Sequence, residues 1–126
     1  VHEKVLAMGV RRFLCHICGE QNLNLPYWVQ VPMGDNGIVH FGHEVDLTTA
    51  IEYFGDTYII AGNVEPQLIQ NGIPQQVYEV SRRCIEKAKY APRGFILSPG
   101  CELPPMAPPY NVYMLKKAVN DFGWYD

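Results

Sequence analysis

The sequence predicts an α/β fold built from four parallel βα units. Four short apolar runs without polar alternation have the pattern of strands that are buried on both faces of a parallel sheet. The runs span residues 12–17, 38–41, 57–61 and 94–97. A Gly-containing polar turn follows each run, and a clear helical pattern follows three of these turns. Right-handed crossovers are therefore expected to join the strands. Four such units form either an open sheet or half of an eight-stranded (β/α)8 barrel.

Residues that start helices mark the segments between and after these strands. Proline is favoured in the first turn of a helix, and an Asp just before a helix accepts hydrogen bonds from its free backbone amides. The expected helices begin after Asp46, at Pro66, at Pro74 and after the pair Pro108-Pro109. Residues 22–36 contain two prolines and no clean period, so we expect a loop there with at most one short helix.

Composition places the chain among ordinary globular proteins and excludes several function classes. Of its 126 residues, 48% are apolar and 18% are charged, and the net charge is −3. Lys and Arg are scattered, so no nucleic-acid partner is expected. No apolar run approaches the roughly 20 residues of a membrane helix, so no membrane association is expected. Nothing marks a secreted chain, and the four cysteines are expected as reduced thiols in a cytoplasmic protein.

Residues that bind metals or transfer protons follow every predicted strand. In parallel α/β folds, functional groups lie just beyond the carboxyl ends of the strands. The residues at these positions are His16, Cys18, Glu20, His43, Glu44, Asn63, Glu65, Cys101 and Glu102. A purely structural domain has no need of this arrangement, so we expect a functional site at this end of the sheet.

His16, Cys18 and Cys101 carry the strongest of these signals. His16 and Cys18 are two residues apart at a strand end, so their side chains face the same way. Cys101 follows the last strand at the equivalent height. Inside a barrel the three side chains would converge, and one His with two Cys suits Zn²⁺ with a fourth position left open. By spacing alone, ordinary packing of the same residues explains the pattern equally well.

The remaining cysteines have structural interpretations. Cys15 and Cys18 form a Cys-x-x-Cys, but residues three apart on a strand face opposite ways, and no helix starts directly after Cys18 as a redox pair requires. Cys15 is expected to pack on the helix-facing side, and Cys84 is expected in the core. The strand pattern does not fix the side on which His40 lies.

Three segments resemble the uroporphyrinogen decarboxylase superfamily. Residues 62–66 (Gly-Asn-Val-Glu-Pro) are similar to its Gly-Asn-x-x-Pro segment, and residues 95–104 are similar to its last strand. Decarboxylases end that strand in Gly-His-Gly. A His-x-Cys segment like that of residues 16–18, followed much later by a Cys, is typical of the methyltransferase branch. The resemblance extends from about Phe13 to the C-terminus and covers the second half of the family's barrel.

The resemblance implies a TIM-type (β/α)8 barrel whose C-terminal half is this chain. It also implies zinc-dependent methyl transfer between a corrinoid, held by a separate corrinoid-binding protein, and a small thiol or a methoxy or methylamine substrate. The implied zinc ligands are His16, Cys18 and Cys101. The candidate catalytic residues are His43 and Glu44. The candidate substrate-binding residues are Asn63 and Glu102, although the Asn63 amide would also suit a role within its own turn.

Two other functions remain open, and so does the question of how much of the barrel the chain contains. The chain is alternatively part of a metal-free tetrapyrrole decarboxylase, or a non-catalytic binding relative that keeps the fold. Residues 1–10 have the pattern of a helix tail without an initiator Met. We therefore expect residues 1–126 to be a single partial domain that lacks the N-terminal half of the barrel. Its outer strands would be free edges, so we expect the chain by itself to form homo-oligomers or to aggregate.

Overall fold

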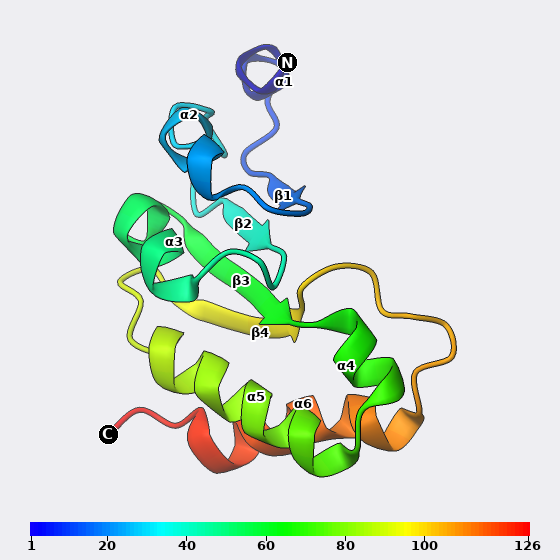
Figure 1. The fold of residues 1–126 in the computed structure, drawn as a ribbon. Helices are drawn as coiled ribbons and strands as arrows, with labels where there is room; N and C mark the ends of the chain where they lie inside the picture. The colour runs from blue at the N-terminus through cyan, green and yellow to red at the C-terminus, as the bar shows by residue number, and fades with distance from the viewer.

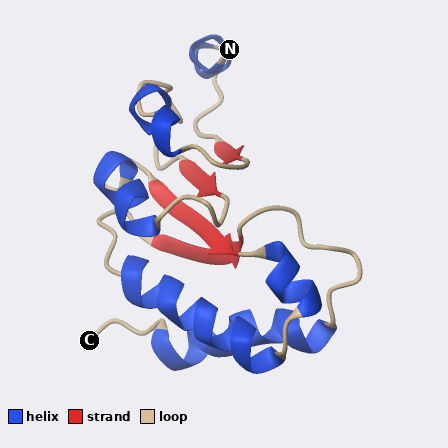
Figure 2. Ribbon diagram, in the orientation of Figure 1, coloured by secondary structure: helices blue, strands red, loops and turns tan.

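The structure, a computed structural model, describes residues 1–126 and contains one four-stranded sheet (Figure 1). The strands, in spatial as well as chain order, are β1 (Leu14–Ile17), β2 (Ile38–Phe41), β3 (Ile59–Val64) and β4 (Phe95–Pro99). Each neighbouring pair is parallel, and the strand arrows of Figure 2 run in a common direction. The structure therefore has the predicted α/β fold of four parallel βα units, which form half of a TIM-type barrel.

The four helices with predicted starts begin at the expected positions or one residue away from them. The helices of the structure are α1 (His2–Ala7), α2 (Leu25–Trp28), α3 (Leu47–Phe54), α4 (Pro66–Asn71), α5 (Pro74–Ala88) and α6 (Pro109–Phe122), with a 3₁₀ turn, η1 (Asn22–Asn24), before α2. The Asp46 carboxylate caps α3 by accepting hydrogen bonds from the backbone N–H groups of Thr48 and Thr49. None of these helices is both long and apolar enough to span a membrane.

The two faces of the sheet differ in burial, and this difference locates the inside of the barrel. Helices α3 and α5 pack against β3, and α6 packs along α5. The side chains under these helices form the core and include Ile17, Val39, Phe41, Ile60 and Val64. On the opposite face Leu14 is 66% exposed and Ile96 is 43% exposed. That uncovered face is the inner surface of the half-barrel.

The strands differ from the prediction at their ends. Strand β2 has the predicted bounds. Strand β1 begins two residues later than expected, because Arg12 forms an isolated antiparallel bridge with Gly34 instead. Strand β3 continues to Val64 through Asn63, where a turn was predicted, because its pairing with β4 continues as far as Pro99.

Candidate metal centre

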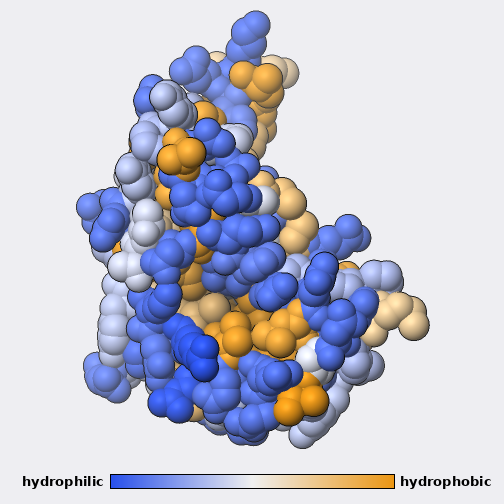
Figure 3. Space-filling model, in the orientation of Figure 1, coloured by the Kyte–Doolittle hydropathy of each residue, from blue (hydrophilic) through white to orange (hydrophobic).

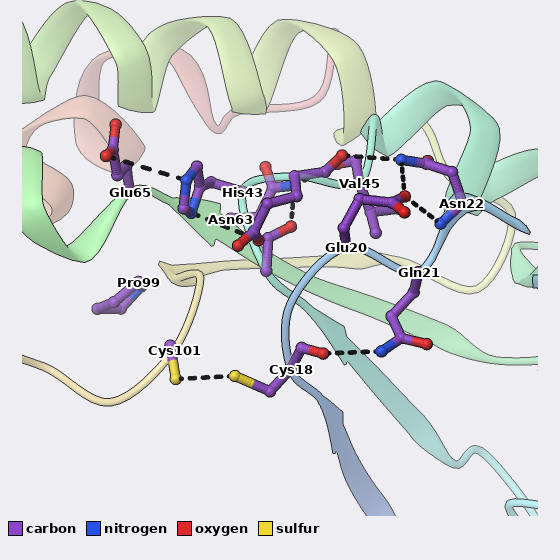
Figure 4. Close-up of polar contacts among 12 residues, drawn as sticks. Cys18, Glu20, Gln21, Asn22, His43, Val45, Asn63, Glu65, Pro99 and Cys101 are labelled. Carbon is purple, nitrogen blue, oxygen red and sulfur yellow. Dashed lines mark hydrogen bonds and ion pairs between the residues drawn. The ribbon is translucent and has the colours of Figure 1, made fainter. Parts of the chain in front are cut away.

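Two distant parts of the chain bring His16, Cys18 and Cys101 together. His16 lies in β1, Cys18 directly follows that strand, and Cys101 lies two residues beyond β4. Strands β1 and β4 are the opposite edges of the sheet, so their ends meet only because the sheet curves as it does in a barrel. The candidate ligand atoms of the three residues all lie within 4.8 Å of one another. Figure 4 shows the two thiols facing each other.

This donor set fits a zinc ion. The two sulfur atoms are 3.6 Å apart. A tetrahedral zinc with Zn–S bonds of about 2.3 Å would hold two sulfurs about 3.8 Å apart, so little movement is needed. Imidazole and thiolate are preferred zinc ligands, and three protein ligands leave the fourth position for a substrate, as in catalytic zinc sites.

The thiol of Cys101 affects the ionisation of Cys18. The Cys101 thiol raises the pKa of Cys18, first through their hydrogen bond and then through charge repulsion, and Glu44 adds a smaller effect in the same direction. Cys18 is exposed and Cys101 is half-buried, so a cation could reach both sulfurs from the inner face. A bound divalent cation would reverse this shift, because it stabilises both thiolates.

A cavity of about 300 Å³ opens beside the thiols at the carboxyl ends of the strands. Its lining includes Cys18, Gly42, His43, Glu44, Glu65 and Cys101. They follow all four strands, as the sequence predicts for a site at the mouth of a barrel. The cavity is therefore adjacent to two of the three candidate ligands, Cys18 and Cys101.

His43 lies between two carboxylates on the rim of this cavity. Its Nδ1 is 3.5 Å from Oε2 of Glu44, and its Nε2 is 3.9 Å from Oε1 of Glu65. Figure 4 shows the imidazole directed toward Glu65. Both predicted catalytic residues thus border the cavity. Glu65, which the sequence indicated only as one polar residue after a strand, joins them.

Asn63 is only 8% exposed, and its amide is used within the protein. Its Nδ2 donates to the Gly42 carbonyl at 3.0 Å and to the Val45 carbonyl at 2.6 Å, and the Cys84 thiol donates to its Oδ1 at 3.7 Å. Asn63 therefore holds the turn between β2 and α3, which carries His43 and Glu44. This geometry favours the turn-stabilising role for Asn63 over direct substrate binding.

The other predicted residues divide between the core and the surface. Glu102 is exposed and does not line the cavity. Cys84 is 7% exposed, as predicted for a core thiol, and burial raises its pKa. Cys15 is half-buried against the core, and burial also raises its pKa. Cys15 and Cys18 therefore lie on opposite faces of β1, which agrees with the prediction that they are not a redox pair.

The sequence left the side of His40 open, and the structure places it beside the candidate ligands. Its ring centroid is 4.6 Å from that of His16, and its Nε2 is 2.8 Å from the Pro99 carbonyl oxygen. Burial lowers the pKa of His40, the contact with Pro99 partly opposes this by raising it, and His16 adds a smaller lowering. The strand register, which pairs His16 with His40, would have revealed this position, but register is a long-range property.

A second cavity lies on the helical side of His43. It has a volume of about 310 Å³ and includes Leu68, Val80 and Arg83 in its lining. In Figure 3 hydrophobic colour gathers in a hollow between α4 and α5. Helix α4 carries Leu68, and α5 carries Val80 and Arg83. The candidate ligands do not line this cavity, so it is not part of the candidate metal centre.

The half-barrel fold, with a His-Cys-Cys cluster at the carboxyl ends of its strands, defines the class as an α/β barrel protein with a candidate metal centre. The family model described as uroporphyrinogen decarboxylase (URO-D) matches residues 2–122. The chain therefore belongs to this family. The match confirms the family that the sequence motifs predicted.

A curated relative places the chain near the methyltransferase branch of the superfamily. The chain is 30% identical over 110 residues to the methylcobamide:CoM methyltransferase MtbA of Methanosarcina acetivorans. The aligned region covers 86% of this chain and 30% of that relative. The chain thus spans about a third of the relative's length, and the resemblance to the methyltransferase branch is confirmed.

Proposed function

We propose that this chain forms the zinc-binding part of a corrinoid-linked methyltransferase. The reaction would move a methyl group between a corrinoid on a partner protein and a small thiol, methoxy compound or methylamine. The observation that carries the proposal is the convergence of His16, Cys18 and Cys101 in a chain similar to a methylcobamide:CoM methyltransferase. Cys101 stands where the decarboxylases of the superfamily have His, which favours metal-dependent methyl transfer over tetrapyrrole decarboxylation.

His16, Cys18 and Cys101 would hold the metal. Two thiolates balance the charge of Zn²⁺, and a neutral imidazole adds a third ligand without excess negative charge. When bound there, zinc supplies Lewis-acid chemistry, which lowers the pKa of a thiol or polarises a heteroatom. The cavity of about 300 Å³ beside the sulfurs gives a small substrate access to this position.

His43 is placed to accept the proton that a thiol substrate releases. Its imidazole lies on the rim of the cavity, with Glu44 near Nδ1 and Glu65 near Nε2. In this proposal Glu44 orients the ring and Glu65 passes the proton toward solvent, because both carboxylates are more than a third exposed. Replacing His43 should therefore slow turnover more than it weakens metal binding.

The geometry of the barrel mouth supports the partner and the remaining contacts in this proposal. A corrinoid-carrying protein would dock over the carboxyl ends of the strands, where the cavity opens. Glu102, exposed in the turn that carries Cys101, would contact the substrate or this partner. Asn63 would contribute indirectly by holding the turn of His43. The four free thiols suit a reducing cytoplasm.

An activity assay tests this proposal. The protein, at the full length that its gene encodes, is mixed with methylcobalamin and candidate thiols, and demethylation is followed by the absorbance of the corrinoid. We expect zinc-dependent turnover that Cys101→Ala abolishes and Cys15→Ala preserves, because Cys15 packs on the other face of β1. Metal-independent decarboxylation of a tetrapyrrole without any methyl transfer would contradict the proposal.

A further inference from the structure

His40 occupies a position on β2 from which its ring reaches both of the strands that carry the candidate ligands. In the register of the sheet it lies beside His16 of β1, and the two ring centroids are 4.6 Å apart with an interplanar angle of 40°. Its partner on the other side is Ala61 of β3. The small Ala61 side chain leaves room for the imidazole to cross β3 and reach β4.

The contact with β4 is directional. Nε2 of His40 lies 2.8 Å from the Pro99 carbonyl oxygen and 3.1 Å from Oγ of Ser98. A carbonyl oxygen only accepts hydrogen bonds, so Nε2 carries the hydrogen that is donated. The Ser98 hydroxyl donates to the same carbonyl at 3.1 Å. Pro99 is the last residue of β4, and Cys101 follows two residues later.

We propose that His40 is a positioning residue for the metal centre. Its side chain fixes the ring of His16 and the turn of Cys101 at the same time. The inference rests on the proposed zinc site. Ring contact with His16 limits the rotation of that imidazole, and the bond to Pro99 fixes the backbone that leads to Cys101. A single side chain thereby sets the separation between ligands that lie 85 positions apart in the chain, at 16 and 101.

A purely structural role for His40 predicts a different result. An aromatic residue of similar size would fill the same space beside His16 and Ala61, so packing alone would be preserved in His40→Phe. The proposed role requires the Nε2–H donor as well, because the donor holds the Cys101 turn. Groups that orient metal ligands in this way typically change metal affinity by about 10–100-fold when they are removed.

The test compares His40→Phe with a matched control, His2→Phe, in the protein at its full natural length. His2 also stacks on an aromatic ring, that of Phe13 at 4.1 Å, and its Nδ1 lies 2.8 Å from the carbonyl oxygen of Pro32. It belongs to α1 and lies outside the candidate centre. Zinc affinity is measured by competition with a chromophoric chelator, and the visible spectrum of the Co²⁺-substituted protein reports the ligand geometry.

We expect His40→Phe to weaken zinc binding by about tenfold or more and to shift the ligand-field bands of Co²⁺. His2→Phe should leave both readouts unchanged. Wild-type affinity and an unchanged Co²⁺ spectrum in His40→Phe would overturn the inference while leaving the zinc centre intact. A wild-type protein that binds neither metal would instead contradict the proposed function. If His40→Phe does not fold, His40→Gln, which keeps a donor but no ring, is compared with His40→Ala, which keeps neither. Tighter zinc binding by His40→Gln than by His40→Ala supports the role of the donor, and equal losses in the two variants would overturn it.

Discussion

At the scale of single residues, Gly100 sets how closely the turn of Cys101 approaches the turn after β2. A Cβ at position 100 would lie 2.8 Å from the backbone nitrogen of His43 and 3.3 Å from Gly42. Because both neighbours are backbone atoms, neither can rotate away. Only glycine therefore allows the present approach between the two turns.

We predict that Gly100→Ala moves the Cys101 turn away from His43 and weakens zinc binding by about tenfold, since the ligand set loses its preorganised geometry. Chelator competition measures the effect. The control is Gly9→Ala, which is also strained, by its backbone φ of 100°, but lies beyond α1 and outside the candidate centre. Equal zinc affinities of the wild type and Gly100→Ala would show that the separation of the two turns does not affect zinc binding.

Asn63 provides a second prediction at this scale. Its amide is the donor to the carbonyls of Gly42 and Val45, so Asn63→Ala leaves both without this partner. We expect a loss of about 1–3 kcal/mol in the free energy of unfolding, measured by urea denaturation. A variant with unchanged stability but a much higher KM would instead indicate direct substrate binding by Asn63.

At the scale of elements, the Asp46 cap connects α3 with α5. The Asp46 carboxylate accepts from two backbone amides of α3 and forms an ion pair with Lys87 of α5. The hydrogen bond with Lys87 has the largest effect on the pKa of Asp46 and lowers it. Burial is the second-largest effect and raises this pKa, and the two amides each lower it by less. The ionised carboxylate is therefore favoured in the folded state.

We predict that Asp46→Ala lowers the free energy of unfolding by about 1 kcal/mol at neutral pH. Asp46→Asn should lower the free energy of unfolding by less, because Asn still caps the helix and an exposed ion pair contributes little to stability. Because the folded-state pKa is depressed, the contribution of the carboxylate is present above the unfolded pKa of about 3.9. It is lost as the pH falls through the folded pKa. Urea denaturation across pH 3–7 should therefore show the wild type and Asp46→Asn converging at the acid end, and a gap that widens there would contradict this account.

Local sequence signals predicted the helices and strands well. Long-range strand pairing explains most of the differences between the predicted and the observed bounds. The bounds of β2 follow from Gly37 and Gly42, which flank an apolar run. Strand β3 was predicted too short, because Gly62 and Asn63 have the pattern of a turn, whereas in the structure they belong to the strand and pair with β4. The ligand set followed from strand ends and family motifs. The position of His40 depends on register, which no local pattern contains.

At the scale of the whole molecule, the sheet has two free edges and an uncovered inner face. Strands β1 and β4 each have only one neighbour in the structure, and Leu14 and Ile96 expose apolar surface between them. Free edges with apolar side chains favour pairing with another chain. We predict that the 126-residue chain by itself forms concentration-dependent oligomers in sedimentation velocity experiments. A monodisperse monomer that unfolds cooperatively would contradict this prediction.

The zinc centre is the central claim, and elemental analysis of the purified protein at its full natural length tests it most directly. Wild type, His16→Ala, Cys101→Ala and the control Cys15→Ala are purified without chelators and their zinc content is measured. We predict about one zinc per chain in the wild type and the control, and little or none in His16→Ala and Cys101→Ala. A zinc-free wild type, or zinc that both ligand substitutions leave in place, would contradict the claim.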